Sequence, residues 1–223
     1  MMFRDRKEAG QLLGDKLREL LPVFLQGERL TSETGVVLGL PRGGVPVAKE
    51  VAEKLALPLD IIVVRKIGVP GQEELAMGAV ASADAEYLNE DVIASMRIDR
   101  ATLNRIRSKK KAEVNQRESA FMDGRQHVEV KDRVAILVDD GLATGASMKA
   151  SVLAMRTKHP RKIIVAVPVA PRGTVAEIRG QADFVVCLTE PEFFFGVGGA
   201  YHVFAQTSDE EVTSILKCAD SRP

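Results

Sequence analysis

Residues 134–155 constrain the fold more than any other part of the chain. Five apolar residues, 134–138, end at two adjacent carboxylates, and a short turn of Gly, Thr and Ser follows. A helical pattern then resumes, so the segment predicts a buried strand that leads through a tight loop into a helix N-terminus. Such a loop presents free backbone N–H groups and the positive end of a helix dipole, which suits a phosphate.

The two carboxylates suit a different ligand group. Asp139 and Asp140 stand directly before the turn, where they can accept hydrogen bonds from sugar hydroxyls or face a divalent cation that the ligand carries. Phosphate, polyol and metal side by side describe a phosphorylated sugar. An Asp-Asp-Gly turn after any parallel strand, with an ordinary helix cap, is the simpler interpretation, but acids, Thr, Gly and Ser all fall at the required offsets.

Strands and helices alternate along most of the chain. Apolar strands are expected at 36–40, 59–64, 134–138, 163–167 and 184–188, and helices at 4–21, 45–56, 90–121, 144–155, 174–179 and from Ser208. This order predicts an α/β fold, a mostly parallel central sheet with helices on both faces. Ligands bind at the carboxyl ends of the strands in such sheets. A polar loop at 67–74 and a hairpin at 75–88 interrupt the alternation.

Composition excludes several classes of protein. The 223 residues suit one domain, 1–223, and 31 Lys+Arg balance 31 Asp+Glu, so no net charge favours nucleic acid or membrane. We expect no membrane span, because no stretch approaches the ~20 apolar residues it needs. The N-terminus lacks an apolar signal core, and two cysteines are expected to be reduced, which points to the cytoplasm. The three histidines show no metal-ligand spacing and are expected at the surface or in caps.

Residues 135–147 resemble the motif of type I phosphoribosyltransferases that binds 5-phosphoribosyl-1-pyrophosphate (PRPP). One position departs from that motif, because Gly141 stands where the family usually has an aliphatic residue. The blocks 39–45, 60–79 and 190–201 also look like bacterial proteins assigned to this family without a known substrate. The resemblance implies the family's α/β fold with a small hood or flap.

The resemblance also implies roles for the motif residues. The ribose hydroxyls would bind to Asp139 and Asp140, which would be the catalytic residues. PRPP would contact the whole loop: Asp139, Asp140, Gly141, Leu142, Ala143, Thr144, Gly145, Ala146 and Ser147. The cofactor would be Mg²⁺, held mainly by PRPP and without a direct protein ligand.

A second anion site is expected after two other strands. The segment Pro41-Arg42-Gly43-Gly44 resembles the family's pyrophosphate loop, where glycines allow close approach of an anion and Arg42 donates to phosphate oxygens. Arg65 and Lys66, at the end of the 59–64 strand, would also face pyrophosphate. Alone, these segments could be a plain turn and a solvated basic pair. The loop 67–74 matches the family's flexible loop, with Gly68 and Gly71 as hinges and Glu73 and Glu74 as solvated charges.

Aromatic residues cluster in the hood segment 190–204. A planar base stacks well on such rings, so base contacts are expected from Phe193, Phe194, Phe195 and Tyr201, although the rings could equally pack the subdomain or a dimer contact. The basic run 97–111 has a thin apolar stripe and no interleaved aromatics. We expect it to be a solvated helix face rather than a nucleic-acid site.

The sequence thus predicts a transferase that moves the 5-phosphoribosyl group to a nitrogenous base and releases pyrophosphate. A homodimer is expected. A PRPP- or nucleotide-sensing regulator without activity is the alternative, although no strongly basic surface supports DNA binding and RNA binding is harder to exclude. A phosphatase would need Asp-x-Asp spacing, which is missing. The acceptor base stays open.

Overall fold

The central element is a five-stranded parallel sheet, seen in a computed structural model that describes residues 2–220. The strand order is β2-β1-β6-β7-β8. These strands span Leu59–Ile61 (β2), Gly35–Gly39 (β1), Val134–Val138 (β6), Lys162–Val169 (β7) and Phe184–Thr189 (β8). The connections after β1 and β6 lead to opposite sides of the sheet, so a crevice opens between these two strands at their carboxyl ends.

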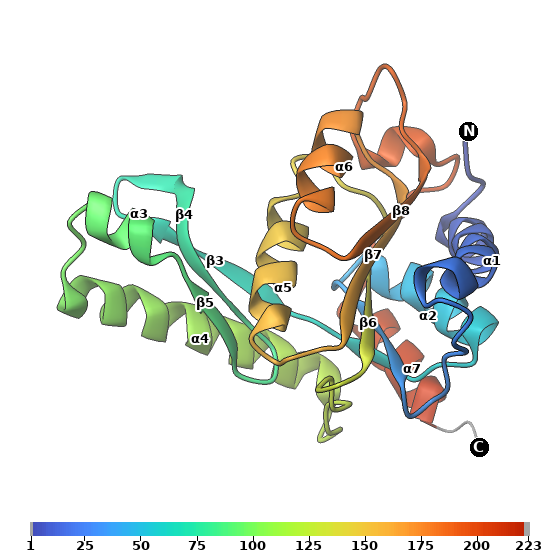
Figure 1. The fold of residues 1–223 in the computed structure, drawn as a ribbon, viewed down its shortest axis with the longest axis horizontal. Helices are drawn as coiled ribbons and strands as arrows, with labels where there is room; N and C mark the ends of the chain where they lie inside the picture. Colours follow the sequence, from blue (N-terminus) through green and yellow to red (C-terminus); the bar gives the residue numbers. More distant parts are fainter. Residues whose placement is uncertain (1, 221–223) are drawn as a thin grey trace.

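Helices cover both faces of this sheet, as Figure 1 shows. One face packs against α1 (Arg6–Phe24), α2 (Gly44–Leu55) and α7 (Asp209–Asp220), through alternate strand residues such as Val37 and Ile136. The other face packs against α5 (Ala146–Arg156) and α6 (Arg172–Arg179), through the intervening residues such as Val36 and Leu137. The predicted α/β fold class is confirmed.

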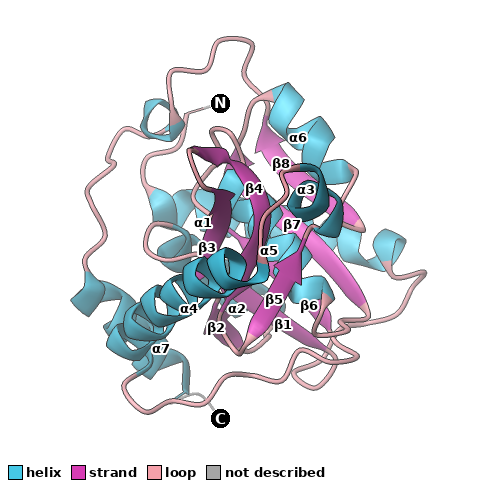
Figure 2. Cartoon of the chain, turned by 90° about the vertical axis from the view of Figure 1, so that its left-hand side faces the viewer, coloured by secondary structure: helices cyan, strands magenta, loops and turns pink. Residues whose placement is uncertain are grey.

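A second, three-stranded sheet forms an arm beside this core. It contains β3 (Val64–Val69), β4 (Gln72–Ala81) and β5 (Ala85–Leu88), all antiparallel. Two helices accompany it, α3 (Glu90–Ser95) and α4 (Arg100–Met122). The arm lies at the left of Figure 1, and α4 crosses in front of it in Figure 2. A short 3₁₀ helix, η1 (Val197–Ala200), lies in the segment before α7.

The arm corrects two predictions. The expected strand 59–64 is two elements, because β2 ends at Ile61 and β3 begins at Val64 in the other sheet. The expected loop 67–74 is the tip of the β3–β4 hairpin, with Gly71 at φ +76° in its turn. The hairpin predicted around Ala83 and Asp84 is present, and both turn residues are left-handed.

The basic run 97–111 has its own partners within the arm. Asp99 caps α4 by accepting a hydrogen bond from the Thr102 N–H group. Arg107 and Lys111 form ion pairs with Glu86 of β5. In the described chain, no helix has the length and apolar character of a membrane span.

Candidate phosphoribosyl site

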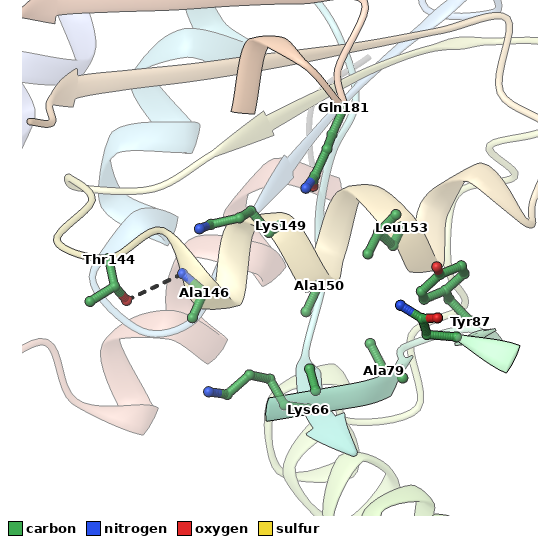
Figure 3. A pocket seen from close by; sticks show the side chains of 12 residues that line it. Lys66, Ala79, Tyr87, Thr144, Ala146, Lys149, Ala150, Leu153 and Gln181 are labelled. Carbon is green, nitrogen blue, oxygen red and sulfur yellow. Dashed lines mark hydrogen bonds between the residues drawn. The ribbon is translucent and has the colours of Figure 1, made fainter. Parts of the chain in front are cut away.

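The loop after β6 is fixed by bonds from both sides. The Leu142 N–H group donates to the Val169 carbonyl (2.9 Å), and the Thr174 hydroxyl donates to the Ala143 carbonyl (2.7 Å). Gly145 stands before α5 in the left-handed region (φ 67°) and gives the helix no side-chain cap. Only Thr144 accepts, weakly, from the Ala146 N–H group (3.4 Å; Figure 3). The first N–H groups of α5 therefore lack a strong cap, and a helix N-terminus of this kind can bind an anion such as phosphate.

Gly141, the departure from the motif, is explained by its surroundings. A Cβ atom here would lie 2.6 Å from Cγ1 of Val197 and 2.8 Å from Cγ1 of Val169. The hood segment and the end of β7 thus press directly on this residue. An aliphatic side chain has no room at this position.

The loop after β1 packs against the two carboxylates. A Cβ on Gly43 would lie 2.0 Å from Oδ2 of Asp140, and a Cβ on Gly44 would lie 2.8 Å from Cα of Asp139. The Pro41–Arg42 peptide bond is cis. Glycine is required here because two loops, about a hundred residues apart in sequence, are in backbone contact at the crevice between β1 and β6.

The two carboxylates differ in their surroundings. Asp139 is half-buried and its Oδ1 accepts from the Asp140 N–H group (2.8 Å), whereas Asp140 is buried and binds the guanidinium of Arg6. Burial, and next the charge of Asp140, raise the pKa of Asp139 well above its ordinary value. Burial also raises the pKa of Asp140, although the hydrogen bond from Arg6 opposes that shift. The two adjacent carboxylates therefore favour a ligand that donates hydrogen bonds to them or carries positive charge.

A basic cavity of about 340 Å³ opens beside Asp139. It is lined by Asp139, Ser147 and three arginines, Arg42, Arg65 and Arg117. Both Arg117 and Arg42 are held by Asp209, at 2.9 Å and 3.5 Å. Sequence reasoning missed Arg117, because it lies on α4 outside any motif and the packing of the arm brings it here.

The predicted pair Arg65-Lys66 is divided between two cavities. Because consecutive residues of β3 point to opposite sides, Arg65 lines the arginine cavity and Lys66 lines a cavity of about 440 Å³ under α5. Figure 3 shows the amino groups of Lys66 and Lys149 pointing toward the Thr144 end of α5. The expected place of the pair, at the end of a parallel core strand, is wrong.

The aromatic residues of the hood segment also divide. Phe193 and Phe195 are 75% and 90% exposed, and with Phe194 they line a cavity of about 150 Å³. Tyr201 is buried instead, and its hydroxyl donates to the Asp140 carbonyl (2.5 Å). Burial raises the pKa of Tyr201. Tyr201, which was expected to contact a base, therefore stabilises the loop that carries Asp140.

His127 was expected at the surface or in a cap, but it lies between two carboxylates. Its Nδ1 is 2.9 Å from Oδ2 of Asp60, and its Nε2 is 2.6 Å from Oε1 of Glu118. Burial lowers the pKa of His127, but hydrogen bonds to the two carboxylates outweigh it and raise the pKa to about 9. His127 is thus an ionic link between β2 and α4. Cys187 is half-buried and Cys218 exposed, and both are free.

Comparison with known proteins agrees with the fold and the loops. The family model of the phosphoribosyl transferase domain matches residues 11–204. The chain belongs to this family. Two Mycobacterium tuberculosis proteins, from strains H37Rv and CDC 1551 and each named a putative phosphoribosyl transferase, are 44% identical over 215 residues. That match covers 96% of this chain but 46% of each relative, so the chain spans about half their length.

A solved structure is similar over nearly its whole length. The crystal structure of TT1426 from Thermus thermophilus is 39% identical, with a TM-score of 0.86, and the match covers 97% of this chain and 98% of that one. The similarity therefore includes the arm as well as the parallel sheet. The arm is thus a feature that this chain shares with TT1426.

Proposed function

We propose that the protein is a phosphoribosyltransferase that binds PRPP with Mg²⁺ and transfers the 5-phosphoribosyl group to a nitrogenous base. The observation that carries this proposal is the contact between the two glycine-dependent loops, 41–44 and 139–147. It sets a phosphate loop, two carboxylates and a basic cavity side by side. A single phosphate needs only the first of these, whereas PRPP uses all three.

Each part of PRPP has a proposed partner. The N–H groups of 143–147, with the Thr144 and Ser147 hydroxyls, bind the 5′-phosphate, whereas the Leu142 N–H group is already bound to Val169. Lys66 lines the cavity beside the same loop. The ribose hydroxyls donate to the carboxylates of Asp139 and Asp140. The pyrophosphate occupies the arginine cavity, where guanidinium groups match phosphate oxygens in geometry and charge.

The residues of the chain position PRPP and stabilise the charges that develop during the transfer. A nitrogen of the acceptor attacks C1 of the ribose, the C1–O bond to pyrophosphate breaks, and pyrophosphate leaves with the electron pair. Carboxylates beside the ribose stabilise positive charge that develops at C1, and the arginines stabilise the departing anion. The exposed rings of Phe193 and Phe195 offer a stacking surface for the acceptor at the ends of β7 and β8.

The carboxylate oxygens of Asp139 and Asp140 are the kind of ligand that a Mg²⁺ ion carried by PRPP would face. Among the described residues, no group of three or more His, Cys, Asp or Glu side chains could hold a metal. The oxygens of PRPP, together with water, would supply the ligands of a bound Mg²⁺ ion. When bound, Mg²⁺ neutralises charge on the pyrophosphate.

Calorimetry with PRPP and Mg²⁺, followed by pyrophosphate release over a panel of purine, pyrimidine and pyridine bases, tests the proposal. We expect binding of PRPP and release of pyrophosphate with at least one base. Binding without release on any base would instead support a sensing role. No binding of PRPP or of a nucleoside monophosphate would overturn the proposal. Light scattering in the same buffer tests the homodimer, which stays a prediction.

A further inference from the structure

The first residues of the described chain form a strap against the hood segment. The Phe3 N–H group donates to the Ala200 carbonyl, and the His202 N–H group donates back to the Phe3 carbonyl, each at 2.8 Å. The Phe3 side chain is fully buried and packs against the Tyr201 ring, with 5.5 Å between ring centroids. The strap thereby fixes where α1 begins, at Arg6.

Arg6 is held on every side. Its Nε and Nη2 atoms each lie 2.8 Å from Oδ2 of Asp140, and its Nη1 donates to the Ala205 carbonyl (2.6 Å). The guanidinium lies 4.0 Å from the centroid of the Phe204 ring. Only 12% of the Arg6 side chain is exposed. A guanidinium so confined imposes one orientation on the carboxylate that it binds.

The groups around Asp140 show which cation its carboxylate depends on. The adjacent Asp139 carboxylate accepts from the Asp140 N–H group, and the Tyr201 hydroxyl donates to the Asp140 carbonyl, so neither side chain offers a positive charge to the Asp140 carboxylate. Arg42 shares a cavity of about 330 Å³ with Arg6 and Asp140, but it is paired with Asp209. Arg6 is therefore the cation in direct contact with a carboxylate that burial drives toward its neutral form.

We propose that Arg6 is a positioning residue of the phosphoribosyl site, which keeps Asp140 ionised and oriented for the ribose. Ribose binding to Asp140 rests on the proposed function, whereas the control of its ionisation does not. A neutral Asp140 accepts fewer hydrogen bonds and stabilises no positive charge at C1. Arg6 thus extends the site to an element that contains none of the family's motifs.

Three variants separate this role from a structural one. Arg6→Gln removes the charge and keeps a donor, and Arg6→Lys keeps the charge without the forked geometry. Arg4→Gln is the matched control, because the Arg4 side chain is 66% exposed and forms an ion pair with the neighbouring Asp5, away from Asp140. All three leave the backbone bonds of the strap available.

Carbon-13 NMR of the aspartate carboxyl groups is the first measurement and needs no ligand. We expect the Asp140 titration to move upward by about 1–3 pH units in Arg6→Gln, by less in Arg6→Lys and not at all in Arg4→Gln. An unmoved Asp140 titration in a folded Arg6→Gln protein overturns the proposal. If Arg6→Gln does not fold, Arg6→Lys tests the orienting role, because it keeps the charge but loses the forked geometry, and wild-type activity in that variant overturns this role.

Activity is the second measurement. The acid limb of kcat/KM for pyrophosphate release should move to higher pH in Arg6→Gln, so the loss of about 10- to 100-fold near neutral pH should shrink as the pH rises. A merely structural role lowers activity equally at every pH, and that result overturns the positioning role. Should the wild type fail to bind PRPP, the proposed function fails, but the NMR titration still decides whether Arg6 controls Asp140.

Discussion

The site consists of two halves that differ in origin. The loop half comprises residues 43–44 and 139–147, consecutive residues at the ends of two adjacent parallel strands. The arginine half comprises Arg42, Arg65 and Arg117 with their partner Asp209, from the β1 loop, β3, α4 and α7. The first half is set by local backbone geometry, whereas the second depends on how the arm packs against the core.

This difference separates two kinds of vulnerability. The loop half tolerates almost no added atoms, because glycines bring backbones into contact. The arginine half consists of side chains that line a cavity, and the helix that carries Arg117 is linked to β2 through His127. Substitutions in the first half should therefore act through chemistry and sterics, and those in the second through affinity and pH.

The largest effect should come from the carboxylates of the loop half. Asp139→Asn removes the charge but keeps the shape and the acceptor for the Asp140 N–H group. Turnover should fall by about 10²–10³, or about 2.7–4 kcal/mol, as for other preorganised groups that stabilise a transition state. Thermal stability should be unchanged, because the substitution removes a partly buried charge next to the like charge of Asp140 and adds none.

Pyrophosphate release under saturating PRPP measures this effect, with circular dichroism to follow unfolding. Asp84→Asn is the control, since Asp84 lies in the left-handed turn of the β4–β5 hairpin, where Asn is equally favoured. A double Asp139→Asn, Asp140→Asn variant with full activity would exclude the assigned roles of both acids.

The next effect concerns pH and the arginine half. Since the pKa of His127 is raised to about 9 in the folded chain, above its ordinary 6.5, folding binds a proton here. The stabilisation is fully present below pH 6.5 and is lost as the pH rises through about 9. Its upper limit is about 3 kcal/mol, from the size of the shift.

Urea unfolding at pH 6 and pH 9.5 checks this link. Wild type should lose more stability over that interval than His127→Gln. The control is His159→Gln, because His159 is not held between two carboxylates, and it should behave as wild type. Equal losses in wild type and His127→Gln would show that the link between β2 and α4 is not ionic.

Gly141 offers a steric test of the loop half. In Gly141→Ala the new methyl group meets Val197 and Val169 at 2.6 and 2.8 Å, so we expect a loss of about 1–3 kcal/mol of stability, as for other overpacked sites. Adding Val197→Ala removes the nearer contact and should recover part of that loss. The double-mutant cycle from urea unfolding measures the coupling, and strict additivity would argue against this contact.

The loop half could be predicted from sequence because its residues are consecutive. The order of apolar run, acids, glycine turn and helix predicts strand, loop and N-terminus without knowledge of anything distant. Gly141 was located but not explained, since its reason lies in Val169 and Val197, each more than 25 residues away. The order of consecutive residues thus predicts where the loop lies, but not which distant side chains pack against it.

The arginine half could not be predicted in the same way. The apolar run 61–64 hides the change from one sheet to the other, because it continues without a break from the end of β2 to the start of β3. The change is fixed by Ser82, whose hydroxyl oxygen accepts from the Val63 N–H group (2.8 Å). The position of Arg117 depends on this change of sheet and on the packing of α4, so no spacing in the sequence could indicate it.

The smallest expected effect tests whether Arg117 belongs to the site at all. Arg117→Gln should weaken PRPP binding by about tenfold, because one charge-assisted contact to pyrophosphate is lost while Arg42 and Arg65 remain. Asp209, freed from its bidentate partner, stays close to Arg42 and can pair with it more fully, which adds to the loss. Arg105→Gln, at an exposed position on the same helix, is the matched control. Calorimetry with PRPP and with ribose 5-phosphate separates the halves: Arg117→Gln should affect only the ligand that carries pyrophosphate, and an equal loss for both ligands would place Arg117 outside the pyrophosphate site.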